Sequence, residues 1–140
     1  MRQSENLNKS LAWRQRKGKE LLGKLNFERK YETLSGANVR NRSEKRIADF
    51  LHKKNITFEY EKKLRLNNRI YYPDFFLPDF NVYIEFFGWC HIPEYQSKVN
   101  EKISTYRENN IKCIYLYHKG SKYLEENLER KLKKLGILNG

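Results

Sequence analysis

The spacing of apolar residues along the chain changes from the period of a helix to that of a strand and back again. Residues 42–54 have apolar side chains at helical spacing, directly after Asn41, which is an expected N-cap. Strand-like segments follow at 57–64, 70–76 and 82–87, and each is bounded by turn-forming residues. This order predicts a helix followed by a three-stranded meander.

The second half of the chain reads as helix, strand and helix. We expect a helix over 94–109, a strand over 111–117, and a last helix that begins at Ser121 and stops at Gly136. The strand is apolar on both faces, as in an interior strand that is reached through a helical crossover. The predicted fold class is therefore α/β, with a mixed central sheet flanked by helices.

The first 38 residues differ from the rest in being strongly basic and only weakly patterned. We therefore expect two parts, a basic and partly helical N-terminal arm over residues 1–38 and a compact domain over residues 39–140. The chain has 140 residues, which is enough for one hydrophobic core. The arm would dock on that core and keep its cations outside.

Positive charge dominates the composition. Lysine and arginine total 29 against 17 acidic residues, which gives a formal net charge of +12. A surplus of this size attracts polyanions, so nucleic acid is the first candidate partner and an anionic membrane surface the second. The cations that we expect to bind nucleic acid are Arg14, Arg16, Lys17, Lys19, Lys45, Arg46 and Lys98.

Neither a membrane span nor a secretion signal is evident in the sequence. No apolar run approaches the roughly 20 residues needed to cross a bilayer, and the polar N-terminus lacks the apolar region of a signal peptide. We expect a soluble, cytoplasmic protein without a membrane partner, or one inside the host cell if its origin is viral. Cys90 and Cys113 have neither the number nor the spacing of a zinc site or a disulfide framework, and we expect both to be reduced.

Two acids lie on neighbouring segments that are otherwise hydrophobic. Asp74 follows Pro73 in one predicted strand, and Glu85 lies in the middle of the next. Moving an ionised carboxylate out of water costs several kcal/mol unless a cation or several hydrogen-bond donors meet it. A divalent metal ion held jointly by Asp74 and Glu85 would supply that positive charge.

These acids and the order of elements resemble the PD-(D/E)XK nuclease superfamily, which has the restriction-endonuclease-like fold. The resemblance covers about residues 41–135. It rests on Glu44 in the first helix, on Pro73-Asp74-Phe75, and on Ile84-Glu85-Phe86-Phe87-Gly88. That last strand, followed by Tyr95 and Lys102, is similar to nuclease-like domains in which a Tyr-x6-Lys helix comes next. The glycine with a histidine shortly after it is also similar to the very-short-patch-repair-like branch.

The resemblance implies a metal-dependent nuclease, and most readily a DNA endonuclease, because the family mostly cuts DNA. It implies Mg²⁺, with Mn²⁺ as a substitute, bound by Asp74, Glu85 and the backbone carbonyl of Phe86. Glu44 would bind the metal through water or complete a second site. The implied catalytic residues are Glu44, Asp74, Glu85 and Lys102, and the accessory residues are His91 and Trp89.

One position departs from the family pattern. The family usually places a lysine two residues after the strand glutamate, and this chain has Phe87 there. Helical geometry favours a replacement from the next helix, since Tyr95, Val99 and Lys102 fall within an arc of about 60° at 100° per residue. Lys98 lies about 40° further round, so we interpret it as a phosphate contact or a solvated residue.

Each of these residues also has a purely structural interpretation. Glu44 would complete a helix-capping interaction with Asn41, Asp74 would be an ordinary turn acid, and Glu85 would belong to an internal ion pair. Lys102 would extend its ammonium group to solvent. His91 would be a loop residue and Trp89 a core residue.

Two other functional classes therefore stay open. One is a catalytically inactive nucleic-acid-binding module on the same fold, which Phe87 favours. The other is a structural or regulatory DNA-associated protein in which the basic arm binds DNA and the acids form an ion-pair network. A homodimer is compatible with the sequence, but no residue pattern indicates a dimer interface.

Overall fold

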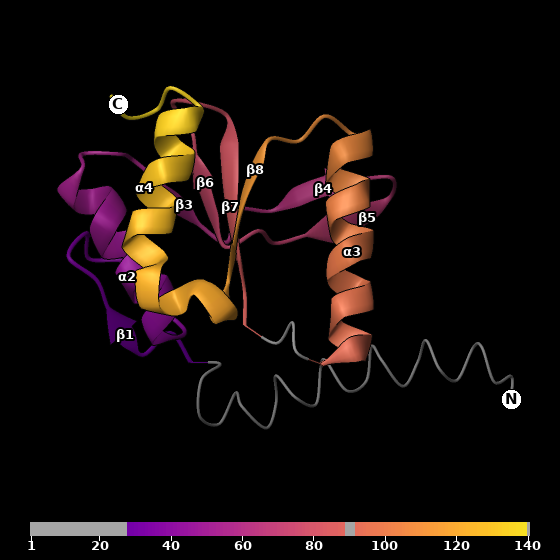
Figure 1. Ribbon diagram of the computed structural model, residues 1–140, viewed down its shortest axis with the longest axis horizontal. Helices are drawn as coiled ribbons and strands as arrows, with labels where there is room; N and C mark the ends of the chain where they lie inside the picture. The colour runs from indigo at the N-terminus through magenta and orange to yellow at the C-terminus, as the bar shows by residue number, and fades with distance from the viewer. Residues whose placement is uncertain (1–27, 89–91, 140) are drawn as a thin grey trace, which may run out of the picture.

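The computed structural model describes residues 28–88 and 92–139 (Figure 1). The predictions for most of the basic arm lie outside this part of the chain, as do those for Trp89, Cys90 and His91. The four arm cations expected to bind nucleic acid, Arg14, Arg16, Lys17 and Lys19, also lie outside it.

A four-stranded mixed sheet forms the centre of the described fold. Its strands are β3 (Glu59–Tyr60), β6 (Phe75–Leu77), β7 (Val82–Phe87) and β8 (Cys113–Tyr117), in that order across the sheet. The pairs β3–β6 and β6–β7 are antiparallel, while β7 and β8 are parallel. The predicted α/β class with a mixed central sheet is thereby confirmed.

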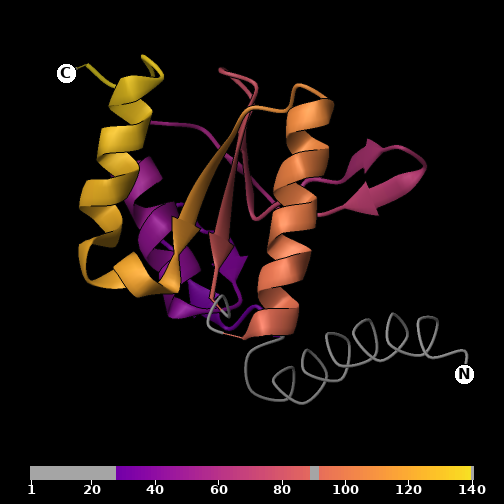
Figure 2. The same ribbon diagram turned by 45° about the vertical axis from the view of Figure 1, so that its right-hand side comes forward.

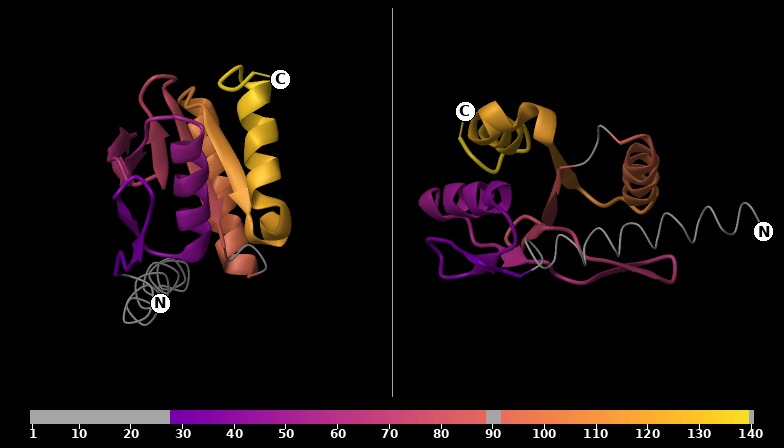
Figure 3. Two further views of the ribbon diagram at one scale, coloured as in Figure 1. Left: turned by 90° about the vertical axis from the view of Figure 1, so that its left-hand side faces the viewer. Right: turned by 90° about the horizontal axis from the view of Figure 1, so that it is seen from below.

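Helices cover both faces of this sheet. Helix α2 (Arg42–Lys53) and helix α4 (Leu124–Lys134) pack together on one face, and α3 (Pro93–Glu108) lies on the other (Figure 3). Asn41 caps α2 as expected, since its side chain accepts a hydrogen bond from the Glu44 amide. Among the described helices, none is long and apolar enough to cross a membrane.

The two faces of the sheet bury different side chains. On the face towards α2 and α4, Val82 and Ile84 belong to an aliphatic core that also contains Leu51 and Leu128. On the α3 face the packing is aromatic: the ring of Phe87 stacks on Tyr115 with 5.8 Å between centroids. Burial on both faces explains why β7 is almost continuously apolar. The prediction that the 111–117 strand is interior is wrong for the described sheet: β8 lies at its edge, and only Ile114 and Leu116, on one face, are buried.

The predicted meander is present, but two of its strands are shorter than expected. The segment expected at 57–64 breaks at Glu61, which has a φ of 55° and whose amide donates to the carbonyl of Asp74. The chain then leaves the sheet as a separate antiparallel hairpin of β4 (Leu64–Leu66) and β5 (Arg69–Tyr71), closed by the expected Asn67-Asn68 turn. This hairpin projects beside α3 (Figure 2).

Of the two ends of the last helix, one differs from the expectation and one agrees with it. A short 3₁₀ helix, η2 (His118–Tyr123), precedes α4, so the last helix begins at Leu124 and not at Ser121. Gly136 ends the helix as predicted, with a φ of 77° in the left-handed region.

A small hairpin precedes α2. Its strands are β1 (Tyr31–Glu32) and β2 (Asn38–Val39), and it contacts α2 through hydrogen bonds from the Leu34 amide to Asp49 and from the Lys45 ammonium to the Glu32 carbonyl. The packed structure therefore already includes residues near the expected joint between the arm and the compact domain.

Candidate functional site

Asp74 and Glu85 come together through the pairing of β6 with β7. Phe75 pairs with Ile84, so continuing this register by one residue places Asp74 opposite Glu85. Directly opposite residues of an antiparallel pair lie on the same face of the sheet, here the face covered by α3. The amide of Phe86 donates a hydrogen bond of 2.7 Å to Asp74 Oδ2, which fixes the Asp74 side chain against β7.

Glu85 is buried, with 3% of its surface exposed, and has two partners from α3. The Tyr106 hydroxyl donates to Oε2 at 2.7 Å, and the Lys102 ammonium lies 3.2 Å from the same oxygen. Burial, and then the charge of Glu85, raise the pKa of Tyr106, so this hydroxyl stays protonated and acts as a donor.

Glu44 reaches the same region from the first turn of α2. Its Oε1 accepts a hydrogen bond of 2.6 Å from the Tyr60 hydroxyl and one of 3.1 Å from the Arg40 amide. Burial raises the pKa of Glu44, although these two hydrogen bonds act to lower it. Glu44 thus takes part in the N-terminal region of α2, as the capping interpretation expects, and also contributes negative charge to the site.

The electrostatics of Asp74 show that these residues form one group. Burial raises the pKa of Asp74 well above its ordinary range, and the negative charges of Glu44 and Glu85 raise it further. The Phe86 hydrogen bond and the positive charge of Lys102 act in the opposite direction. We call Glu44, Asp74 and Glu85 the carboxylate cluster. All four residues implied as catalytic are therefore neighbours in space.

Lys102 occupies the side of Glu85 on which Phe87 lies. Its ammonium is 5.7 Å from the centroid of the Phe87 ring, and its side chain is 31% exposed. Phe87 stands where the resembled family places its lysine, so the helix brings an ammonium group to the neighbourhood of that position. The position of Lys102 on the apolar arc of the helix therefore predicts correctly that its side chain faces the sheet.

Each carboxylate of the cluster is held through one oxygen. The bonds described above use Asp74 Oδ2, Glu85 Oε2 and Glu44 Oε1, and the second oxygen of each makes no hydrogen bond to the described residues. Every fully buried polar side-chain atom in the described residues has a partner, so these second oxygens reach accessible space. Hydrogen-bond donors that hold one oxygen of a carboxylate and so orient the other are typical of metal centres.

The donor set fits a hard divalent cation in its chemistry. Carboxylate oxygens and a backbone carbonyl are oxygen ligands, and Mg²⁺ takes few protein ligands and keeps several waters. Within the described residues, however, no group of three or more His, Cys, Asp and Glu side chains is arranged to hold a metal ion. The fit therefore rests on two carboxylates, Asp74 and Glu85, together with the Phe86 carbonyl.

The cations predicted to bind nucleic acid have varied surroundings. The Arg46 guanidinium contacts both carboxylate oxygens of Glu125, at 2.8 and 2.5 Å, and so connects α2 to α4. Lys45 forms an ion pair with Asp49 at 3.1 Å. Lys98 lies on α3, one turn before Lys102, and is partly exposed. Arg46 and Lys45 thus have structural partners in addition to any role in binding.

Cys113 is a free, partly buried thiol. Burial raises its pKa well above the ordinary value, and the charges of Glu85 and Asp74 raise it further. The thiol stays protonated and donates a weak hydrogen bond of 3.6 Å to the carbonyl of Ile114.

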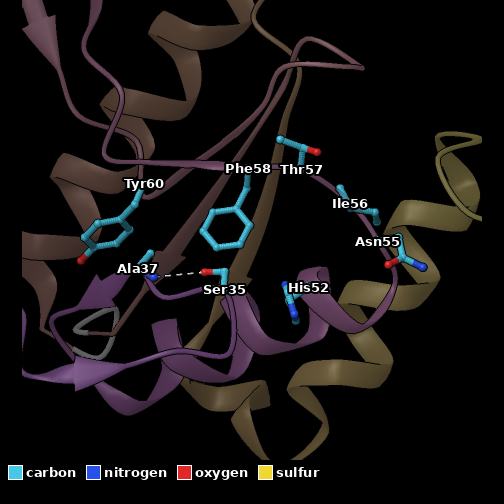
Figure 4. Close-up of a pocket in the computed structure, with 8 residues that line it drawn as sticks. All are labelled: Ser35, Ala37, His52, Asn55, Ile56, Thr57, Phe58 and Tyr60. Atoms are coloured by element: carbon cyan, nitrogen blue, oxygen red, sulfur yellow. Dashed lines mark hydrogen bonds between the residues drawn. The ribbon is translucent and has the colours of Figure 1, made fainter.

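A separate pocket of about 440 Å³ lies between the β1–β2 loop, the end of α2 and β3 (Figure 4). Ser35, His52 and Phe58 are among its lining residues, and none of the predicted site residues lines it. Tyr60 lines the pocket and also donates to Glu44, so it connects the pocket wall to the cluster.

Sequence reasoning missed the roles of Tyr60 and Tyr106 as donors to the cluster. Tyr106 lies on the same helical arc as Lys102, which was a usable signal for its proximity to Glu85. Tyr60 carries no comparable signal, because its contact with Glu44 depends on how β3 crosses the start of α2.

Comparisons with known proteins identified no relative of this chain. No protein-family model matches the chain, and no curated protein or solved structure matches it either.

Proposed function

We propose that this protein is a metal-dependent nuclease that hydrolyses phosphodiester bonds, most readily a DNA endonuclease, on a restriction-endonuclease-like fold. The observation that carries the proposal is the convergence of Asp74, directly before β6, and Glu85, on β7, with Glu44 and Lys102 from two helices. An internal ion-pair network needs roughly balanced charges. Here three acids face two cations: Lys102 pairs with Glu85, while Arg40, whose charge also acts on Glu44, is itself paired with Glu61. A cation is the simplest complement to the excess negative charge.

The arrangement of elements supports the proposed fold. A helix carrying an acid precedes an antiparallel β3–β6–β7 unit, and α3 then leads to the parallel strand β8. Both strand acids lie at the end of the β6–β7 pair, and the two helices deliver Glu44 and Lys102 to that end. This is the order in which the resembled superfamily presents its site.

Mg²⁺ or Mn²⁺, when bound, would polarise the scissile phosphate and lower the pKa of an attacking water. Asp74, Glu85 and the Phe86 carbonyl would hold the ion, and Glu44 would act through water. The Lys102 ammonium would stabilise the negative charge that develops on the phosphate oxygens. Tyr106 holds Glu85 Oε2 and so leaves the other oxygen of Glu85 for the ion.

The net charge of the chain supports a nucleic-acid substrate. A formal charge of +12 would concentrate polyanions near the molecule, although three acids gather at the proposed site. A negatively charged cluster on a strongly basic protein is what a cation-dependent phosphodiesterase requires, because the substrate and the metal have opposite charges.

The proposal is tested by cleavage assays with the full chain. Supercoiled plasmid and labelled duplex, single-stranded, flap and junction DNA would be incubated with Mg²⁺, Mn²⁺ or EDTA. The variants Asp74→Ala, Glu85→Ala and Lys102→Ala would be assayed beside the wild type. We expect metal-dependent cleavage that all three variants lose. Cleavage that persists in EDTA, or in every variant, would contradict the proposal.

One observation favours a second function, a catalytically inactive nucleic-acid-binding module on the same fold. Lys102 and Tyr106 both contact Glu85 Oε2, so the charge of Glu85 is partly compensated without a metal. Salt-sensitive binding of nucleic acid with no cleavage in either metal would support this alternative.

A further inference from the structure

The β4–β5 hairpin has two different faces. Its register pairs Leu64 with Tyr71, Leu66 with Arg69, and Arg65 with Ile70. Paired residues share a face, so the first two pairs lie on one side of the hairpin and the third lies on the other. The first side packs towards α3: the ring of Tyr71 is 5.6 Å from that of Tyr106.

The docked face is also held by charge. Arg69 forms an ion pair with Glu101 of α3, with 3.1 Å between Nη1 and Oε1. This contact and the Tyr71–Tyr106 contact fix the orientation of the hairpin, which projects beside α3 (Figure 2). The opposite face is therefore turned outward.

The outward face combines cations with large apolar side chains. Arg65 and its neighbour Lys63 are exposed, and neither forms an ion pair with any residue that the structure describes. Ile70 is 42% exposed, and Tyr72, directly after β5, is 58% exposed. No acidic residue occurs between Lys62 and Tyr72. Exposed apolar residues beside uncompensated cations suit a partner with both phosphate charge and stacking or groove surfaces.

The hairpin is directly connected to the carboxylate cluster. Tyr72 precedes Asp74 by two residues. Tyr71 contacts Tyr106, which in turn donates to Glu85. Because Tyr72 lies on the outward face and only Pro73 separates it from Asp74, a polymer held on that face would lie near the residues proposed to cleave it.

We propose that the outward face of the β4–β5 hairpin, formed by Lys63, Arg65, Ile70 and Tyr72, is a binding surface for nucleic acid next to the proposed cleavage site. The inference rests on the proposed nuclease function for its substrate. Lys63 and Arg65 contact backbone phosphates, while Ile70 and Tyr72 pack against sugars or bases. The hairpin thereby positions the substrate as well as increasing its affinity.

The test measures binding separately from cleavage. Fluorescence anisotropy of a labelled DNA duplex, with EDTA present, would give the dissociation constant of the full chain over a series of salt concentrations. The first variant is Lys63→Ala/Arg65→Ala, and the second is Ile70→Ser/Tyr72→Ser. Lys62→Ala is the matched control, because Lys62 is the adjacent cation and is paired with Glu59 at 3.6 Å.

The two variants are expected to differ in kind. Removing two phosphate contacts should reduce the slope of log K against log [salt] by about 2. Replacing Ile70 and Tyr72 should raise the dissociation constant about fivefold or more, while the slope of log K against log [salt] stays the same. Thermal melts of each variant confirm that the domain remains folded.

Three results would overturn the inference, and they are distinguishable. Wild type that fails to bind any DNA would remove the proposed function together with the hairpin surface. If the wild type binds and cleaves DNA, and both hairpin variants have the same dissociation constant as the Lys62→Ala control, only the inference about the hairpin surface would be overturned. If the two hairpin variants bind phosphatidylserine vesicles more weakly than the wild type does, but bind DNA equally well, the face would be assigned to a membrane.

Discussion

Lys102 of helix α3 forms an ion pair with Glu85 of strand β7, with 3.2 Å between Nζ and Oε2. The lysine thereby lies beside the acid that the sequence marked as anomalous, and above the ring of Phe87. An ammonium group at this point would neutralise Glu85 in the absence of metal and face a bound phosphate in its presence. Variants of Lys102 should therefore change the cleavage rate constant and the metal affinity in different ways.

Removal of the Lys102 ammonium is expected to reduce the cleavage rate constant about 10²–10³-fold, because a stabilising charge is lost from the transition state. Metal affinity should be unchanged or higher, since Glu85 loses a competing cation. Single-turnover cleavage by Lys102→Ala measures this. Lys98→Ala, one turn earlier on α3, is the control and should lose far less activity.

The Tyr106→Phe variant is expected to lose the donor that orients Glu85. A buried hydrogen bond to a charged group contributes about 1.5–3 kcal/mol, so denaturant unfolding should show a loss in that range. Metal affinity should fall about 10–100-fold, as for other partners of metal ligands. Mn²⁺ titration measures the second effect.

The control for Tyr106→Phe is Tyr83→Phe. Tyr83 lies on β7 and is buried, as Tyr106 is, but its hydroxyl makes no hydrogen bond to the described residues. Equal Mn²⁺ affinity in Tyr106→Phe and the wild type would show that the hydroxyl has only a structural role.

The metal-free protein is expected to lose stability as pH rises through the titration of Asp74. The pKa of Asp74 is raised on folding, by burial and then by Glu44 and Glu85. Folding therefore favours the protonated form, and the stability present below the ordinary aspartate pKa is lost as pH rises towards the folded-state pKa.

Asp74→Asn removes this titration and keeps an acceptor for the Phe86 amide. The variant should be more stable than the metal-free wild type at neutral pH, and a gain of about 1 kcal/mol would raise Tm by about 3–5 °C. The difference should shrink towards acidic pH. A variant that is less stable than wild type at neutral pH would indicate that Asp74 stabilises the fold as an ion.

The Arg46–Glu125 contact predicts an effect on stability more than on binding. Both side chains are more than one third exposed, so Arg46→Ala should cost at most about 1 kcal/mol in the free energy of unfolding. Glu125→Ala frees the guanidinium and should increase affinity for nucleic acid. Unchanged affinity in both variants would exclude Arg46 from the binding surface.

Local patterns predicted the order of elements well. The stripe of Ile47 and Leu51, the cap at Asn41 and the stop at Gly136 depend on interactions within a few residues, which the sequence displays directly. The break at Glu61 was not predictable in this way, because it depends on a hydrogen bond to the carbonyl of Asp74, which lies directly before β6. Hence the segments predicted at 57–64 and 70–76 are each divided between the central sheet and the β4–β5 hairpin.

The parts of the site that follow from helical spacing and from a charged residue in an apolar strand were predictable from the sequence. An acid between apolar neighbours marked Glu85, and helical angles placed Lys102 beside it. The contacts of Glu44 with Tyr60, and of Arg46 with Glu125, join segments far apart in the chain. No short-range pattern encodes them, so only the packed structure identifies these partners.

Metal binding by the carboxylate cluster can be measured without knowledge of the substrate, and the proposed nuclease function depends on it. Thermal unfolding of the full chain would be followed at increasing Mn²⁺ concentrations, for the wild type and for Asp74→Asn. A ligand at 100 times its dissociation constant stabilises the folded state by about 2.7 kcal/mol. We expect a saturable rise in Tm for the wild type and none for Asp74→Asn. No rise in the wild type, or an equal rise in both proteins, would contradict the proposed function.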